Sequence, residues 1–158
     1  MQRKMKFLLI GLAASSLLAG CSSIDLNPNP NEGGVYTAAD FNNPNSPLSQ
    51  KSIYFDFDSY AVPAEAQAMV EAHAVYLSTH PTATVVLEGN TDERGGREYN
   101  LALGQKRSDA VKNRLQLLGV PAERLESVSF GKEKPRALGK DEASYQENRR
   151  VDIQYRTK

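Results

Sequence analysis

The sequence predicts a mixed α/β domain over residues 51–158, with about four strands backed by two long helices in an α+β sandwich. Two observations predict this fold class. Strand-like runs alternate with helix-like runs, and Gly, Pro and Asn residues separate them. The length of 158 residues, 40% of them hydrophobic, fits one domain with appendages.

Each element is expected from its local pattern. Aromatic and β-branched residues predict the first strand, and Pro63 suits the first turn of the Ala-rich helix that ends before His80-Pro81. Gly and Asn residues predict the loop 89–96, and Gly119 ends the second long helix. In chain order we expect a strand at 52–57, a helix at 64–79, a strand at 84–88, a helix at 98–118, a strand at 125–130, a short helix at 142–148 and a strand at 150–155.

Two segments precede this domain. Residues 1–20 combine a basic start with a short apolar run, which is typical of a signal peptide and too short for a membrane-spanning helix of about 20 apolar residues. The run ends in Leu18-Ala-Gly-Cys21, which resembles the lipobox of bacterial lipoproteins, so Cys21 is the expected lipidation site. Residues 21–50 are rich in Asn, Pro and Gly, and we expect them to form a disordered tether.

The composition excludes several classes of function. The formal net charge is zero, so we expect no nucleic-acid partner, and a single Cys excludes a disulfide framework and a Cys-based zinc cluster. We interpret His73 and His80, which lie within and at the end of the first helix, as structural, because no Ser stands in a nucleophile-elbow motif. No cofactor is expected.

Charged residues gather where strands are expected to end. Asp56 and Asp58 lie at or just past the end of the first strand and Asp92 follows the second, so the three can share one rim of the sheet. Arg107 falls inside the apolar arc of the second helix, where a guanidinium needs an anion or a route to water. A rim with both signs of charge suits a zwitterionic ligand. The open alternatives for Arg107 are snorkelling and a structural ion pair with Asp92 or Glu93.

The three aspartates also allow enzymatic interpretations. An Asp-x-Asp after an apolar strand resembles haloacid-dehalogenase phosphatases, but Tyr60 stands where that motif has Thr or Val. Spacing alone leaves open a carboxylate pair for glycoside hydrolysis, although the chain has no Trp to stack on sugar rings. A metal site built from Asp56, Asp58 and Asp92 is a further alternative.

Five ordered motifs resemble the OmpA-like peptidoglycan-binding domain family. They are YFDFD at 54–58, EGNTDERG at 88–95, YNLALGQKR at 99–107, SFGKEKP at 129–135 and NRR at 148–150. One small departure is Asn90, where many members of the family have His. The resemblance covers residues 51–158, and the lipobox and tether fit lipid-anchored members of the family.

The resemblance implies a ligand and the residues that hold it. The ligand is the meso-diaminopimelate residue of the peptidoglycan stem peptide, whose far end carries a carboxylate and an amine. Arg107 would clamp the carboxylate with its planar fork of donors, and Asp92 would accept from the ammonium. The expected secondary contacts are Asp58, Asn100, the loop that begins at Thr91, and Arg149 or Arg150, of which one contacts the ligand and the other is solvated.

The resemblance also implies a cellular role. The protein would be a non-enzymatic lipoprotein, anchored in outer-membrane lipid through acylated Cys21, with its domain in the periplasm. Its second partner would be the periplasmic β-propeller protein TolB. Together they would keep the outer membrane attached to the wall and constrict it at division. The runner-up function is a lipid-anchored wall hydrolase or metal-dependent phosphatase that uses Asp56, Asp58 and Asp92.

Overall fold

The computed structural model describes residues 35–156. The expected signal peptide, the lipidation site at Cys21 and the first part of the tether lie outside the described residues. Within residues 35–156, no helix has the length and apolar character that crossing a membrane requires.

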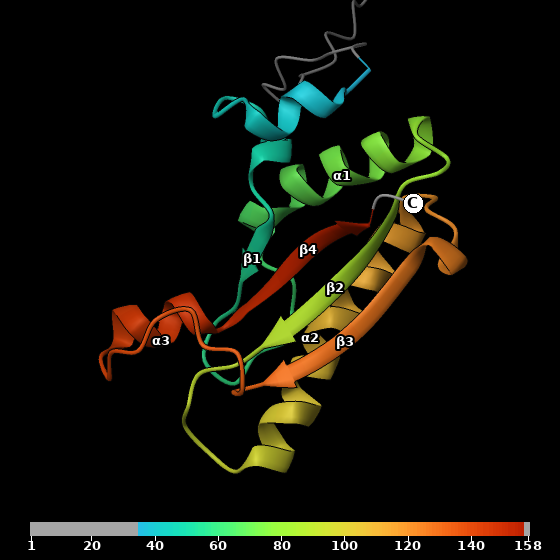
Figure 1. The fold of residues 1–158 in the computed structure, drawn as a ribbon. Helices are drawn as coiled ribbons and strands as arrows, with labels where there is room; N and C mark the ends of the chain where they lie inside the picture. The colour runs from blue at the N-terminus through green and yellow to red at the C-terminus, as the bar shows by residue number, and fades with distance from the viewer. Residues whose placement is uncertain (1–34, 157–158) are drawn as a thin grey trace, which may run out of the picture. The chain divides into compact units, whose positions relative to one another are not determined.

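Four strands form one sheet in the order β1-β4-β2-β3 (Figure 1). They are β1 (Ser52–Tyr54), β2 (Thr84–Asn90), β3 (Leu125–Gly131) and β4 (Arg150–Arg156). β2 and β3 are parallel, whereas β4 runs antiparallel to both β1 and β2. The carboxyl ends of β1, β2 and β3 therefore meet the amino end of β4 at one edge of the sheet.

Two long helices, α1 (Gln67–Thr79) and α2 (Arg97–Leu117), pack on the same face of this sheet. A short 3-10 turn, η3 (Ala64–Ala66), leads into α1, and another, η4 (Ala122–Arg124), leads into β3. The α3 helix (Glu142–Asn148) comes directly before β4. The core under the two long helices contains Ile53, Val70, Leu77, Val85, Leu87, Val111, Leu115, Val151 and Ile153. The predicted sandwich of four strands and two long helices is confirmed.

The first strand is shorter than expected. Strand pairing ends at Tyr54, although the aromatic run continues to residue 57. Beyond Phe55, which still donates its N–H to the carbonyl of Arg149, the chain turns away, and Asp58 has a left-handed backbone with φ of 54°. An aromatic run predicts β propensity, but no partner strand continues beside Asp56 and Phe57.

The start of α2 lies very close to β2. A Cβ atom on Gly89 would stand 1.9 Å from the carbonyl oxygen of Gly104, so only glycine fits at this crossing. This close approach brings Asn100 and Arg107, on either side of Gly104 along α2, against the carboxyl end of β2. The two glycines therefore determine how near the helix comes to the site.

Residues 35–50, here called the N-terminal strap, are folded, so the expected tether boundary at residue 50 was wrong for this part. The strap forms two 3-10 helices, η1 (Ala38–Asn42) and η2 (Pro47–Ser49). Its side chains Tyr36 and Leu48 are buried in a second cluster against α1. A few large apolar side chains offset the turn-rich composition because α1 offers a complementary face.

Both histidines are structural, as interpreted. His73 is fully buried, and its Nε2 lies 2.8 Å from the carbonyl oxygen of Gln50 in the strap. A carbonyl only accepts, so Nε2 carries the proton, and Nδ1 accepts from the Tyr155 hydroxyl at 2.8 Å. The ring of His80 stacks on Tyr76 at a centroid distance of 4.0 Å.

Candidate functional site

A pocket of about 150 Å³ opens at the sheet edge where the strand ends meet. This is several times the roughly 30 Å³ that one water molecule occupies in the liquid. All six binding residues expected from the sequence line it, namely Asp58, Thr91, Asp92, Asn100, Arg107 and Arg149. The other lining residues are Phe57, Arg94, Gly95, Tyr99 and Leu103.

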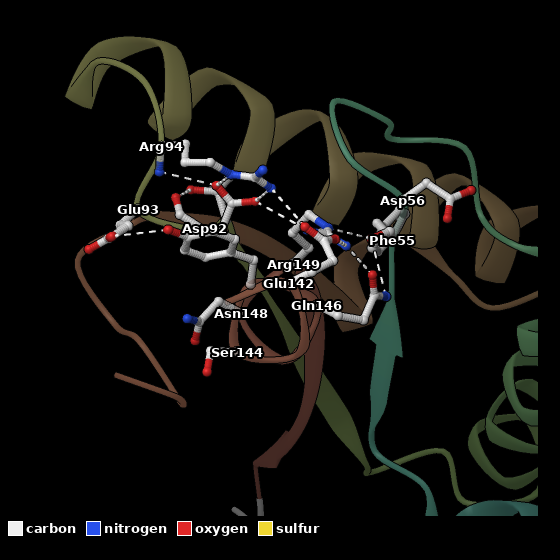
Figure 2. Close-up of polar contacts among 12 residues, drawn as sticks. Phe55, Asp56, Asp92, Glu93, Arg94, Glu142, Ser144, Gln146, Asn148 and Arg149 are labelled. Atoms are coloured by element: carbon white, nitrogen blue, oxygen red, sulfur yellow. Dashed lines mark hydrogen bonds and ion pairs between the residues drawn. The ribbon is translucent and has the colours of Figure 1, made fainter. Parts of the chain in front are cut away.

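Asp92 is the buried acid of this pocket and is held by two arginines (Figure 2). Its Oδ1 accepts from the backbone N–H of Arg94 at 3.1 Å and from Arg94 Nε at 3.2 Å. Its Oδ2 accepts from Arg94 Nη2 at 2.7 Å and from Arg149 Nη1 at 3.3 Å. Burial alone would raise the pKa of Asp92, but the hydrogen bonds from Arg94 and Arg149 outweigh burial and lower it. The carboxylate is therefore ionised.

Arg107 is the buried cation of the pocket, and it forms no ion pair among the described residues. Its guanidinium donates instead to three backbone carbonyls, from Nε to Ser59 at 2.7 Å, from Nη1 to Asn90 at 3.0 Å and from Nη2 to Asp56 at 3.0 Å. Burial, together with the positive charge of Arg149, lowers the pKa of Arg107 to about 10, so it stays charged at neutral pH. These bonds use three of its five N–H donors, which leaves two for an anion.

The alternatives considered for Arg107 are thereby decided. It neither snorkels nor pairs with Asp92 or Glu93. Arg114, in the same apolar arc of α2, differs from Arg107: it is half-buried, and its Nη2 lies 3.6 Å from Oε1 of Glu71 in α1.

Arg149 is the one residue of the Arg149-Arg150 pair that lines the pocket. It is buried, and donates from Nε to the Phe55 carbonyl at 3.0 Å and from Nη2 to Glu142 at 2.7 Å. Arg150 points to the other face of the sheet, where it is buried and bonds Asp152 at 3.0 Å. The expectation that the second arginine is solvated was therefore wrong, because a carboxylate on the same strand neutralises it.

Asp58 lies at the exposed rim of the pocket. Its Oδ1 accepts a short hydrogen bond from the hydroxyl of Tyr99 at the start of α2. This bond to Asp58 raises the pKa of Tyr99. The pair joins the chain after β1 to α2 and forms one wall of the pocket.

The loop after β2 is held from three sides. Thr91 donates its N–H to the Gly131 carbonyl at 2.9 Å, and Asn100 donates from Nδ2 to the Arg94 carbonyl at 2.8 Å. Lys132 donates from Nζ to the Gly95 carbonyl at 2.8 Å. Thr91 and Asn100 are both buried, and their hydrogen bonds hold the loop that carries Asp92.

Of the five lining residues that the sequence did not predict, Arg94 is the one with a charge. Its guanidinium lies between two aromatic rings, 4.4 Å from the centroid of Phe57 and 4.3 Å from that of Tyr145. An arginine in a Gly-rich loop is indistinguishable from a solvated one in the sequence. The position of Arg94 beside Asp92 becomes evident only in the structure, where α3 brings Tyr145 against its guanidinium.

The metal-site alternative gains no support. Within residues 35–156, no group of three or more His, Cys, Asp and Glu side chains is placed to hold a metal ion. Asp56 does not line the pocket: its side chain is exposed, and only its carbonyl serves the site, as an acceptor for Arg107. Asp58 and Asp92 line the pocket without Asp56.

Comparison with known protein families identifies the class to which this domain belongs. The OmpA family matches residues 54–149, which include every pocket residue. The chain belongs to the OmpA family, as its motifs indicated.

The relatives narrow the group further. The chain is 43% identical to the peptidoglycan-associated lipoprotein of Haemophilus influenzae, over 98% of this chain and 100% of that one. The crystal structure of the peptidoglycan-associated lipoprotein from Burkholderia pseudomallei superposes with a TM-score of 0.72 at 57% identity, covering 74% of this chain and 99% of that chain. The C-terminal domain of Helicobacter pylori MotB shares the fold at 22% identity with a TM-score of 0.64, covering 69% of this chain and 86% of that one. Within the family, the chain is thus similar to peptidoglycan-associated lipoproteins over almost its whole length.

Proposed function

We propose that this protein is an outer-membrane lipoprotein whose domain binds the meso-diaminopimelate stem peptide of peptidoglycan noncovalently. As part of the Tol-Pal system it links the outer membrane to the wall and supports constriction of the envelope at division. The lipid anchor at Cys21, the periplasmic position of the domain and the partner TolB are parts of the same proposal. Support comes from the pocket and from the similarity to peptidoglycan-associated lipoproteins.

The single observation that carries the proposal is the separation of charges in the pocket. Asp92 and Arg107 line one cavity, yet Arg107 donates three hydrogen bonds to backbone carbonyls and none to Asp92. Two of its five N–H donors remain for a ligand. The free end of meso-diaminopimelate carries a carboxylate and an ammonium side by side. Arg107 is assigned the carboxylate and Asp92 the ammonium, because each then meets the opposite charge in a partly dehydrated site.

The remaining pocket residues have supporting roles in this proposal. Asp58 and Tyr99 form the wall beside the ligand, and Thr91 and Asn100 hold the loop of Asp92 in place. Arg149 orients the Asp92 carboxylate and adds to the effect of Arg94 in lowering its pKa. We assign the domain no catalytic step, and the roles assigned here to Asp92, Arg107 and Arg149 all belong to binding.

Co-sedimentation with purified peptidoglycan sacculi tests this function. The variants are Asp92→Asn and Arg107→Lys, each of which keeps size and some hydrogen bonding. Arg156→Ala, at the far end of β4 in an exposed ion pair with Glu126, is the control. We expect the affinity for sacculi to fall at least tenfold in each site variant, because one charge-assisted bond is worth about 1.5 to 3 kcal/mol. The control should bind with the wild-type affinity.

Two further readings complete the experiment. The double variant should lose less than the sum of the single losses, because both residues grip one end group. A stem peptide with meso-diaminopimelate should compete with the sacculi, whereas the same peptide with an internal lysine, whose side chain ends in an ammonium without a carboxylate, should not. If both site variants bind sacculi as tightly as the wild type, the site assignment is refuted. Release of soluble wall fragments or of phosphate would favour the enzymatic alternative.

A further inference from the structure

The carboxylate of Asp92 has no acceptor site left for a ligand. A carboxylate offers about four lone-pair directions. The protein itself directs four N–H donors at Asp92, three from Arg94 and one from Arg149. An ammonium group that is to bind Asp92 must therefore replace one of these donors.

Arg94 is the partner that can leave. Its side chain is 38% exposed, whereas that of Arg149 is 4% exposed and is anchored by the Phe55 carbonyl and by Glu142. Arg94 lies on a loop, while Arg149 directly precedes a strand of the sheet, and both line the pocket. Displacing the side chain of Arg94 breaks two bonds to Asp92 and leaves its backbone N–H bond in place.

A second carboxylate stands ready to receive Arg94. Nη2 of Arg94 lies 3.7 Å from Oε2 of Glu142, at the outer limit of an ion pair. Glu142 and Tyr145 lie on the same short helix, α3, and Tyr145 already stacks on the guanidinium. A small shift along the ring of Tyr145 would exchange Asp92 for Glu142 while the stacking on Phe57 and Tyr145 persists.

We propose that Arg94 is an internal competitor that selects for the ligand's amine: it holds Asp92 until an ammonium group takes its place, and it then moves to Glu142. This inference rests on the function proposed above. It makes Arg94 a specificity-determining residue, since only a ligand with an ammonium beside its carboxylate compensates Asp92 for the lost guanidinium. It also places a cost on binding, because the binding-competent arrangement is the minor one.

Titration calorimetry with two peptides tests this inference. One peptide carries meso-diaminopimelate, and the other carries 2-aminopimelate, which keeps the distal carboxylate and lacks the distal amine. Arg94→Met removes the charge and keeps an unbranched side chain between the two rings. Arg97→Met is the matched control, because Arg97 is an exposed neighbour that pairs with Glu133 and does not line the pocket.

The expected result is a change for one peptide only. Arg94→Met should raise the affinity for the meso-diaminopimelate peptide by roughly 3- to 10-fold, because a partly exposed ion pair leaves a competent fraction of about a tenth to a third. The affinity for the 2-aminopimelate peptide should stay within about twofold, since that ligand leaves Arg94 in place. Arg97→Met should leave both affinities as in the wild type.

Several results would overturn the inference. If Arg94→Met weakens binding of the meso-diaminopimelate peptide or leaves it unchanged, Arg94 does not compete for Asp92. If the wild type binds neither peptide, the proposed function itself fails, which is a different outcome. A nuclear magnetic resonance signal from Nε–Hε of Arg94 in the wild type gives a measurement independent of the variant's folding. It should shift with the meso-diaminopimelate peptide and not with 2-aminopimelate.

Discussion

The carboxylate of Asp92 and the guanidinium of Arg107 line the same pocket, but they do not form an ion pair with each other. Asp92 accepts from Arg94 and Arg149, and Arg107 donates to the carbonyls of Ser59, Asn90 and Asp56. Mutual neutralisation would have left a structural ion pair and no charge for a ligand. The two charges stay separate because each side chain has its own hydrogen-bond partners in the fold.

Arg107 is expected to matter for stability as well as for binding. Its three hydrogen bonds tie the chain after β1 to the end of β2, and its removal leaves three carbonyls without their donor. We predict that Arg107→Ala lowers the free energy of unfolding by about 3 kcal/mol, measured by urea denaturation. Arg114→Ala, a half-exposed arginine two turns along the same helix, should lose less than about 1 kcal/mol. A wild-type denaturation midpoint for Arg107→Ala would contradict this role.

His73 should make the domain sensitive to acid. Burial first, partly opposed by the bond to Gln50, lowers the pKa of His73 from 6.5 to about 4. The unfolded chain therefore binds the extra proton between about pH 6.5 and pH 4, so the stabilisation is complete above pH 6.5 and is lost as the pH falls towards 4. The loss amounts to about 3 kcal/mol across this window.

Urea denaturation at pH 4, 5, 6 and 7 measures this effect. The variant His73→Gln has no group that titrates at this position, so its stability should fall less steeply with acid. Equal slopes for wild type and variant would show that the acid sensitivity arises elsewhere.

The strap should be a stabilising part of the domain. Leu48 is fully buried against α1. We predict that Leu48→Ala costs about 2 to 4 kcal/mol of unfolding free energy through lost burial and a cavity. Leu138→Ala, at a site that is 85% exposed, should change stability by less than about 0.5 kcal/mol. If Leu48→Ala is as mild as Leu138→Ala, residues 35–50 do not belong to the cooperative unit.

The crossing of α2 and β2 should not tolerate a side chain. A Cβ on Gly89 would overlap the backbone of Gly104 at 1.9 Å, so Gly89→Ala must separate helix and strand. We predict a loss of about 3 kcal/mol or more in thermal or urea unfolding, and weaker sacculus binding because Asn100 and Arg107 move with the helix. Gly96→Ser is the control, since no atom lies within 4 Å of its Cβ position and Ser is a good N-cap for α2. A stable Gly89→Ala variant would mean that the helix has room to shift.

Local patterns were sufficient for most of the fold. The β-branched run of β2 is a strong signal because the strand is buried almost throughout, and α2 is long enough, at 21 residues, for its Gly119 stop and its turn-rich flanks to define it. The end of β1 was not predictable, since it depends on whether a partner strand continues beside Asp56. The folded strap was missed for a similar reason: its few apolar residues are buried only because α1 presents a face to Leu48.

By itself, the sequence determined the fold class, the family motifs and the set of charged residues at the strand ends. These follow from periodicity and residue type, which act over a few neighbouring positions. Only the tertiary structure decided how the charges are shared. Arg94 joins Asp92 because α3 brings Tyr145 and Glu142 beside the loop, and Arg107 stays free of carboxylates because three carbonyls from distant segments reach it first. Hydrogen-bond partners depend on distances of a few ångströms between segments far apart in the chain, and no local pattern specifies those distances.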